Sequence, residues 1–416
     1  MFNIQDIYAY EILDSRGNPT VCCVMQSTGG DVVQSKVPSG ASTGKFEAYE
    51  LRDLDSKRFK GKGVLKAIEN INHIIKPAVV GRQFENQSDF DEVLIKMDGT
   101  INKSKLGANA ILAVSMAFSR LFALSNDQHL YESFHPTNLI FPTPMFNLIN
   151  GGKHADSGLE IQEFMIFPIG ISDFKEKVRA GSEIFHTLKD ILAQKGHKTS
   201  VGDEGGFAPA LSSSFEALDL LSEAVKKAGY KLGEEIFFCI DAAANEFYVD
   251  GKYKFTLSGE KHELTSDQLL EVYGEMIEKY PFYSIEDPFQ EEDIQAWQKF
   301  TKKFGDKIQI VGDDLLVTNT TKLSQAIEGA WCNAILIKPN QIGTVTETLK
   351  AISMAQNEAF NVVISHRSGE TDDTFISDLA LGVSNGQIKT GAPSRGERVA
   401  KYNRLLEIYY SVNINL

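Results

Sequence analysis

The feature that most constrains the fold is a series of short apolar runs, each ending on a charged residue or a histidine. The residues that end these runs are Asp241, Glu286, Asp313, Lys338, His366 and Lys389. From residue 286 onward they stand 27, 25, 28 and 23 positions apart. This spacing fits a strand, a helix and two loops, the repeating unit of a parallel α/β barrel. Because the carboxyl ends of barrel strands meet at one face, we expect these six side chains to form one ring.

The sequence upstream of the repeat follows a different pattern, and 416 residues are too many for one ordinary core. Apolar runs at 20–25 and 31–37 predict strands, and the periodicity at 64–75 and 105–124 predicts helices. Prolines 136, 142 and 144 mark a linker. We therefore predict an N-terminal α+β capping domain at 1–136 and an α/β barrel catalytic domain at 137–416.

Composition excludes several classes of protein. A formal net charge of −14, with no basic stripe to offset it, argues against nucleic-acid binding. The most apolar window, Gly107 to Phe118, has 12 residues, which suits a core helix and is too short for a membrane span. The N-terminus lacks the features of a signal peptide, and the four cysteines form no CxxC pair. We expect a cytoplasmic protein with reduced, buried cysteines.

Three of the run-ending residues, Asp241, Glu286 and Asp313, are carboxylates on different predicted strands. Taken singly, each is more simply a helix cap or an ion-pair partner. Gathered in a ring that also holds two lysines, they favour a metal site. Hard oxygen ligands of this kind suit Mg²⁺.

Lys338 and Lys389 both end apolar strands, so we expect both to be partly desolvated and close to the metal. Both effects favour the neutral amine, which would allow a lysine to act as a base. Glu204 lies in a glycine-rich loop at 201–209, a pattern that alone indicates a tight turn but gives the carboxylate close access to a ligand. Arg367 offers a guanidinium and Ser368 a hydroxyl, which together suit a phosphate or a carboxylate.

One short motif suggests other chemistry. The stretch Gly40–Gly44 matches the G-x-S-x-G pattern of serine hydrolases, but it lies far in sequence from the predicted barrel ring. The neighbouring Gly44-Lys45 hints at a phosphate-binding P-loop. That interpretation fails because Ser39 stands where the first glycine is needed and Phe46 where a hydroxyl residue is needed.

Longer motifs occur in order along almost the whole chain. They are 13–20, 37–44, 106–116, 150–154, 162–164, 202–206, 284–289, 340–343, 365–371 and 388–391. With these motifs the sequence resembles the enolase family, the phosphopyruvate hydratases. The resemblance implies a reversible dehydration of 2-phosphoglycerate to phosphoenolpyruvate, in glycolysis and gluconeogenesis, with two Mg²⁺ ions per active site. A lysine base working with Mg²⁺ is the known chemistry of this superfamily, so that pairing comes from the resemblance.

The resemblance also implies a role for each matching residue. Lys338 matches the general base at C2 and Glu204 the general acid at the C3 hydroxyl. Asp241, Glu286 and Asp313 match the ligands of the first Mg²⁺, and Ser42 matches a ligand of the second, which the substrate phosphate also binds. The substrate-binding positions are His154, Gln162, Glu163, Glu286, Asp313, His366, Arg367, Ser368 and Lys389.

The family further implies an atypical barrel with an early antiparallel strand, and a homodimer that in some bacteria becomes an octamer. A secondary pool at the cell surface or outside the cell is compatible with it. Two alternatives stay open. The first is a racemase or lactonising enzyme of the same superfamily acting on a carboxylate without phosphate, which Ser42, Arg367 and Ser368 argue against. The second is a non-catalytic role as a surface receptor, a crystallin-like protein or an RNA-decay scaffold.

Overall fold

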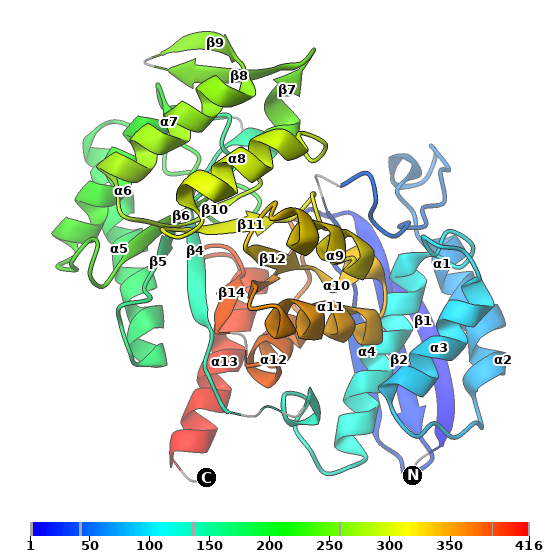
Figure 1. The fold of residues 1–416 in the computed structure, drawn as a ribbon. Coiled ribbons are helices and arrows are strands. Elements are labelled where there is room, and N and C mark those ends of the chain that lie inside the picture. The colour runs from blue at the N-terminus through cyan, green and yellow to red at the C-terminus, as the bar shows by residue number, and fades with distance from the viewer. Residues whose placement is uncertain are drawn as a thin grey trace.

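The computed structural model describes residues 3–40, 44–134, 136, 138–155, 157–257, 259–384 and 386–414. Within these residues the chain forms an N-terminal α+β unit and a closed barrel of eight strands, which lie side by side (Figure 1). The predicted fold class is confirmed. The predicted boundary after residue 136 stays a prediction.

The N-terminal unit is a three-stranded antiparallel sheet covered by helices. Its strands are β1 (Ile4–Leu13), β2 (Pro19–Ser27) and β3 (Val32–Lys36), in that order. The first turn forms because the Asp14 side chain accepts hydrogen bonds from the backbone N–H groups of Arg16 and Asn18, at 2.8 and 2.9 Å. The helices are α1 (Leu65–Glu69), the π-helical segment η2 (Asn70–Ile75), α2 (Lys76–Val79), α3 (Gln87–Asp98) and α4 (Ala108–Leu124).

Helix α4 contains the most apolar stretch of the sequence and is the core helix of this unit. It packs on β2 and β3 on one side and on α3 and the barrel helix α10 (Pro339–Ile342) on others, which buries almost all of its residues. None of the helices in the described part of the chain has the length and hydropathy to cross a bilayer. The four cysteines, all within the described residues, are buried free thiols, as predicted.

The barrel strands follow one another in the neighbour order β10-β11-β12-β13-β14-β4-β5-β6, and β6 closes onto β10. All pairs are parallel except those of β5, which runs antiparallel to both β4 and β6. The expected antiparallel early strand is therefore present. The strands are β4 (Thr143–Asn150), β5 (Glu163–Phe167), β6 (Phe237–Asp241), β10 (Phe282–Glu286), β11 (Gln309–Gly312), β12 (Ala334–Ile337), β13 (Asn361–Ser365) and β14 (Gln387–Lys389).

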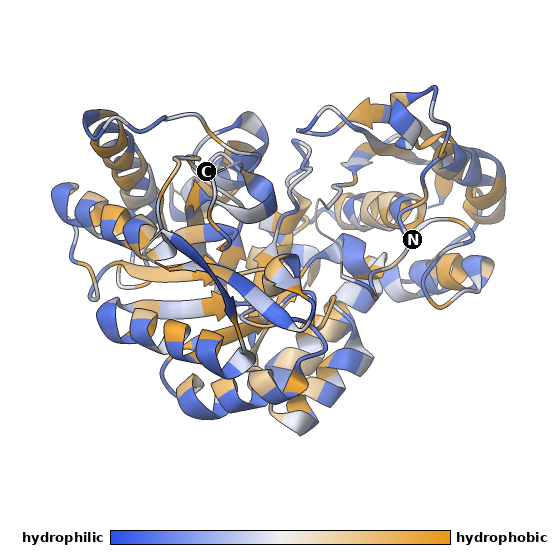
Figure 2. Cartoon of the chain, turned by 90° about the horizontal axis from the view of Figure 1, so that it is seen from above, coloured by the Kyte–Doolittle hydropathy of each residue, from blue (hydrophilic) through white to orange (hydrophobic). Residues whose placement is uncertain are grey.

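Helices surround the barrel, and hydrophobic and hydrophilic residues alternate along most of them (Figure 2). They are α5 (Phe174–Gln194), α6 (Ser214–Lys227), α7 (Ser266–Lys279), α8 (Ile294–Phe304), α9 (Thr320–Gly329), α11 (Val345–Asn357), α12 (Phe375–Gly382) and α13 (Gly396–Ile414). A small outer sheet holds β7 (Tyr248–Val249), β8 (Lys252–Leu257) and β9 (Glu260–Leu264), and short helical turns are η1 (Phe59–Gly61), η3 (Glu132–Phe134), η4 (Gly152–His154) and η5 (Ala244–Phe247).

The barrel interior explains why the strand ends carry the site. Cys239, Val311 and Leu336 belong to the cluster of side chains that fills the barrel. Because side chains on a strand alternate between faces, the residue two positions later points the same way. Those residues are Asp241, Asp313 and Lys338, at the carboxyl-terminal mouth. Glu286 stands two positions after Ser284, and Lys389 two positions after Gln387. Ser284 and Gln387 form hydrogen bonds with Gln309 in a polar layer inside the barrel.

The N-terminal unit also reaches the mouth of the barrel. The buried Asp91 of α3 accepts a hydrogen bond from the backbone N–H of Thr346, at 2.8 Å, and so caps the first turn of α11. The backbone N–H of Ala48 donates to the carbonyl of Gln341, which lies in α10 just after β12, at 2.7 Å. The first contact joins α3 to α11, and the second holds the segment around Ala48 against α10.

Candidate active site

The amine of Lys389 lies among three carboxylates at the barrel mouth. Its Nζ lies 2.9 Å from Asp241 Oδ2, 2.8 Å from Glu286 Oε1 and 3.0 Å from Glu163 Oε1. All four side chains are buried. The carboxylates outweigh burial and raise the pKa of Lys389 well above its ordinary value.

Glu163 reaches this cluster because its strand runs backwards. In an antiparallel strand the first residue, not the last, lies at the mouth, and β5 begins at Glu163, paired in register with Asp241. Gln162, the residue before it, is buried beside Asp241, with Nε2 at 3.4 Å from Oδ2. The run-ending pattern could not predict Glu163, because it applies only to parallel strands.

Lys338 faces Asp313, with Nζ at 2.5 Å from Oδ2. The other carboxylate oxygen of Asp313 accepts a hydrogen bond from Gln341 Nε2 at 2.8 Å. Gln341 in turn is fixed by the Thr318 hydroxyl, at 2.8 Å from Oε1. The Lys338 amine is therefore positioned by a chain of buried polar side chains.

The neutral state expected of the two lysines depends on a neighbouring metal ion and stays a prediction. Burial alone would lower the pKa of Lys338, but the adjacent Asp313 carboxylate more than offsets this and raises it. The sequence argument included burial and a neighbouring metal, but it omitted the carboxylates that each lysine contacts directly.

Glu204 lies at the tip of a tight turn in which Gly202 N–H donates to the Gly206 carbonyl at 2.8 Å. Gly205 has φ of +86°, a conformation that glycine adopts without strain. The buried carboxylate accepts from Asn147 Nδ2 at 3.0 Å. Its Oε2 also lies 3.4 Å from His154 Nδ1 and 3.5 Å from His366 Nε2. Burial would raise the pKa of Glu204, but its surroundings, His154 first among them, hold it well below the ordinary value.

The segment after β13 provides Arg367 and Ser368. The Arg367 guanidinium forms a two-pronged ion pair with Glu47 of the N-terminal unit, at 3.0 and 3.1 Å, and also donates to Asn340 Oδ1 at 3.0 Å. The Ser368 hydroxyl accepts from Arg16 at 3.3 Å. Glu47 and Arg16 show that both parts of the chain build this side of the site.

The structure brings almost all the predicted site residues together. One cavity of about 20 Å³ is lined by His154, Gln162, Glu163, Glu204, Asp241, Lys338, Ser365, His366, Arg367, Ser368 and Lys389. Glu286 and Asp313 join it through their contacts with the two lysines. Ser42, the predicted ligand of a second ion, lies outside the described residues.

The donor set at the mouth suits a hard divalent cation. Asp241, Glu286 and Asp313 offer carboxylate oxygens only, and Glu163 Oε2 has no hydrogen-bond partner among the described residues. Burial and the neighbouring carboxylates raise the pKa of both Glu163 and Glu286 well above the ordinary value. The cavity therefore carries more negative charge than its lysines neutralise, and the residues present fit Mg²⁺.

The tightest groups of metal-ligating atoms in the described chain differ from the predicted ligand set. They are His154 with Glu163 and Glu204, and Asp287 with Asp313 and Asp314. Only Asp313 is common to the predicted set and these groups. Asp241 and Glu286 are instead bridged by the Lys389 amine.

Comparison with known proteins gives the family. A family model described as the N-terminal domain of enolase matches residues 4–134, and one described as the C-terminal TIM barrel domain of enolase matches residues 138–413. A protein named Enolase from a Nitratiruptor species is 53% identical over 409 residues, which cover 98% of this chain and 96% of that protein. The chain belongs to the enolase family. The resemblance inferred from the sequence motifs is confirmed, and the chain is placed among the lyases of that family.

Sequence reasoning missed several residues of this enolase-family site. Asn147 could have been found by alternation, since it stands two positions after Met145, which faces the barrel interior. Gln341 follows the Lys338 strand end closely and could have been considered with it. Glu47 and Arg398 gave no usable signal, because they come from the other unit and from the last helix, and only the folded chain places them here.

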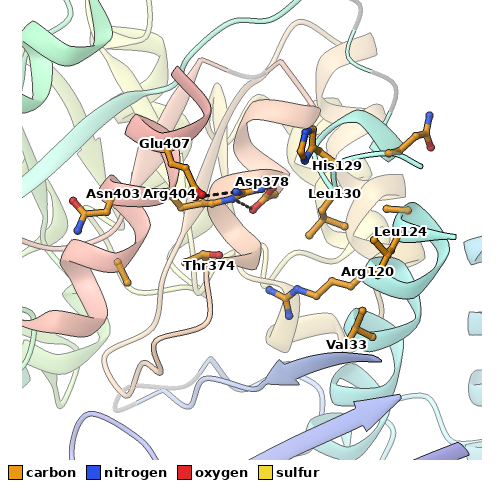
Figure 3. Close-up of a pocket in the computed structure, with 13 residues that line it drawn as sticks. Val33, Arg120, Leu124, His129, Leu130, Thr374, Asp378, Asn403, Arg404 and Glu407 are labelled. Carbon is orange, nitrogen blue, oxygen red and sulfur yellow. Dashed lines mark hydrogen bonds and ion pairs between the residues drawn. The ribbon is translucent and has the colours of Figure 1, made fainter. Parts of the chain in front are cut away.

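A second, larger cavity lies away from the enolase barrel mouth, where β3, α4, α12 and α13 meet (Figure 3). Its volume is about 680 Å³, but its charged side chains are already paired. Arg404 binds Asp378 at 3.0 and 2.8 Å, and Arg120 binds the neighbouring Asp373 at 2.8 and 2.6 Å.

Proposed function

We propose that this chain is a magnesium-dependent enolase that reversibly dehydrates 2-phosphoglycerate to phosphoenolpyruvate, with Lys338 as general base and Glu204 as general acid. The observation that carries the proposal is that both side chains line one buried cavity together with Lys389 and Arg367. A base and an acid in one cavity, beside groups that bind anions, meet the needs of this reaction.

The reaction removes a proton and a hydroxide from adjacent carbons. Lys338 Nζ takes the proton from C2 as the C2–H bond breaks, and the electron pair left at C2 is delocalised into the neighbouring carboxylate. The C2–C3 double bond then forms as the C3–O bond breaks. Hydroxide is a poor leaving group, so a proton from Glu204 converts it to water.

Lys338 and Glu204 both need a change of protonation state before they can act. Lys338 must lose the proton that Asp313 stabilises. Bound Mg²⁺ would supply positive charge to the substrate carboxylate and, by engaging Asp313, would weaken the ion pair that keeps Lys338 protonated. The side chains that would hold it are Asp241, Glu286 and Asp313, with Ser42 for a second ion. Glu204 gains its proton more easily once an anionic substrate lies beside it, since like charge raises the pKa of a carboxyl group.

The other side chains bind and orient the substrate in this proposal. Arg367 and Ser368 present a guanidinium and a hydroxyl to the phosphate. Lys389 and Gln162 face the side where the substrate carboxylate would lie. His154, Glu163 and His366 surround the acid. The cavity of about 20 Å³ holds about one water molecule, so the side chains that line it must move apart for the substrate to bind.

The test is an ultraviolet absorbance assay with purified protein, 2-phosphoglycerate and Mg²⁺. We expect absorbance to grow as the conjugated product forms, to stop on addition of EDTA and to resume with excess Mg²⁺. A non-phosphorylated 2-hydroxy acid is the control, because a racemase or lactonising enzyme would turn it over. An absence of product from 2-phosphoglycerate would overturn the proposal.

The proposal extends to domain organisation, assembly and location, which rest on the family resemblance. It includes a division of the chain after residue 136, a homodimer or an octamer of such dimers, and a place in the cytoplasm with a secondary pool at the cell surface or outside the cell. Light scattering coupled to size exclusion distinguishes monomer, dimer and octamer directly.

A further inference from the structure

Arg398, at the start of α13, is completely buried although it carries a permanent charge. Its aliphatic stem packs against Gly391, where an added Cβ would lie 3.0 Å from the Arg398 Cδ. A buried guanidinium is costly unless its N–H groups find acceptors. The acceptors of the Arg398 guanidinium come from two loops of the active site.

The two terminal nitrogens of Arg398 contact four acceptors in two separate loops. Nη1 lies 2.6 Å from the Arg367 carbonyl and 2.5 Å from His366 Nδ1. Nη2 lies 2.6 Å from the Ser368 carbonyl and 3.1 Å from the carbonyl of Asp203, the residue before Glu204. One side chain thus ties the segment after β13 to the turn that carries Glu204.

The contact with His366 fixes which ring nitrogen carries the proton. A guanidinium has only donors, so Nδ1 of His366 must be the acceptor. The neutral imidazole then carries its hydrogen on Nε2. That nitrogen lies 3.5 Å from Glu204 Oε2, so the N–H faces the carboxylate.

The charged groups around His366 come from several elements. Glu204 faces it from its turn, Arg398 from α13, Lys389 from β14 and Lys338 from the end of β12. Burial lowers the pKa of His366 well below its ordinary value, against the opposing influence of Glu204. With Nδ1 accepting from Arg398, the ring carries a single proton, and its tautomer decides what it presents to Glu204.

We propose that Arg398 is a positioning residue that holds His366 as the Nε2–H tautomer directed at Glu204 and joins the two loops that carry these side chains. The role of Glu204 as an acid rests on the proposed function. The tautomer and the loop contacts do not, so they are tested separately from activity.

The first test measures the tautomer in the unmodified protein. ¹⁵N-histidine labelling gives ring-nitrogen shifts that distinguish Nδ1–H, Nε2–H and doubly protonated rings, and His366→Gln identifies the His366 signals among those of eight histidines. We expect an Nε2–H ring that does not titrate between about pH 6 and 8, near the ordinary histidine pKa. An Nδ1–H ring, or a ring that titrates in this window, would overturn the proposal whether or not the protein is an enolase.

The second test uses Arg398→Lys, with Arg404→Lys in the same helix as the matched control. Lysine keeps the charge but cannot reach four acceptors from a planar fork. We expect kcat to fall at least about tenfold, as is typical when a partner that orients a working side chain is lost. We also expect the acidic limb of the pH profile of kcat to shift. A variant that is only less stable would keep the parent profile.

The control fixes the interpretation of the second test. Arg404→Lys should leave both kcat and its pH profile close to those of the parent protein. A kcat of Arg398→Lys equal to that of the control, or a loss with an unchanged pH profile and an unchanged His366 tautomer, would reduce Arg398 to a purely structural residue. If neither parent nor variants turn over 2-phosphoglycerate, the proposed function fails, and the tautomer measurement still decides the role of Arg398.

Discussion

The barrel-mouth cavity is much smaller than the cavity of Figure 3, but its charged side chains are less evenly balanced. The mouth cavity measures about 20 Å³ and that of Figure 3 about 680 Å³. At the mouth, burial raises the pKa of Glu163 and Glu286, and neighbouring carboxylates, which outnumber the amines that contact them, raise it further. In the larger cavity, Arg404 and Arg120 each have a carboxylate partner of their own.

This difference shows that volume is a poor guide to chemistry here. Paired charges satisfy one another and leave no strong demand for a ligand. A buried set of carboxylates with too few cations is costly and is stabilised by anything that brings positive charge. Variants that change charge in one region but not in the other therefore test whether the two regions differ in charge balance.

The largest expected effect is at Lys338. Lys338→Ala removes the proposed base, and we expect kcat to fall by about 10²–10⁴-fold, the usual contribution of a general base. Lys338→Arg is the matched variant, because arginine keeps the charge beside Asp313 but does not lose its proton. Steady-state assays with 2-phosphoglycerate measure both. Turnover in either variant within about threefold of the parent, far below that contribution, would remove Lys338 from the role of base.

The second effect concerns stability without metal. Lys389→Met leaves Glu163, Asp241 and Glu286 without the amine that now contacts all three. We expect the free energy of unfolding in EDTA to fall by about 3–5 kcal/mol, the usual cost of an uncompensated buried charge, and Mg²⁺ to recover part of it. Thermal and urea unfolding with and without Mg²⁺ measure this.

Lys401→Met provides the control for that experiment. Lys401 is equally buried and binds Glu370 at 2.8 Å, but it does not line the mouth cavity. Its loss should destabilise the chain to the same extent with Mg²⁺ and with EDTA. An equal Mg²⁺ effect on both variants would contradict a metal site at the mouth.

The sequence predicted the mouth better than the rest of the site, for a physical reason. Asp241, Glu286 and Lys338 lie at ends of parallel strands, where alternation and the barrel repeat fix both position and direction. Glu47 and Arg398 both contact Arg367, from 320 and 31 positions away in the sequence. No local sequence pattern predicts contacts at these separations. The sequence argument left out the carboxylates beside the two lysines for the same reason, since only the folded chain brings them into contact.

The third prediction uses pH, because the two regions should respond with opposite sign. Burial and nearby carboxylates raise the pKa of Glu163 above that of the unfolded chain, so in EDTA its charged form costs stability at neutral pH. Glu163→Gln should therefore raise Tm in EDTA at pH 7, by about 1–2 °C, and the gain should shrink as the pH falls through the raised pKa. Glutamine keeps the size of the side chain, so packing changes little.

Asp373 is the counterpart in the second region. Its partner Arg120 outweighs burial and lowers its pKa, so its charged form contributes stability above the unfolded value of about 3.9. Asp373→Asn should lower Tm at pH 7, and the loss should vanish as the pH falls through the lowered pKa. Thermal unfolding between about pH 3 and 7, which spans the ordinary carboxyl range, tests both variants. The same sign for both would show that the two regions do not differ in charge balance.

The smallest expected effect is at Arg404, which Figure 3 shows directed at Asp378. Arg404→Met removes an ion pair whose arginine side chain is 24% exposed, so solvent already screens much of the interaction. The free energy of unfolding should fall by about 1 kcal/mol, and kcat/KM should stay within about twofold of the parent value. Unfolding and activity must be measured on the same preparation, because an unfolded fraction would lower apparent activity without any change at the mouth. A tenfold loss of kcat in fully folded protein would mean that the larger cavity is energetically coupled to the mouth. Arg404 and Arg398 share α13, so that coupling would run through the helix that holds His366 in place.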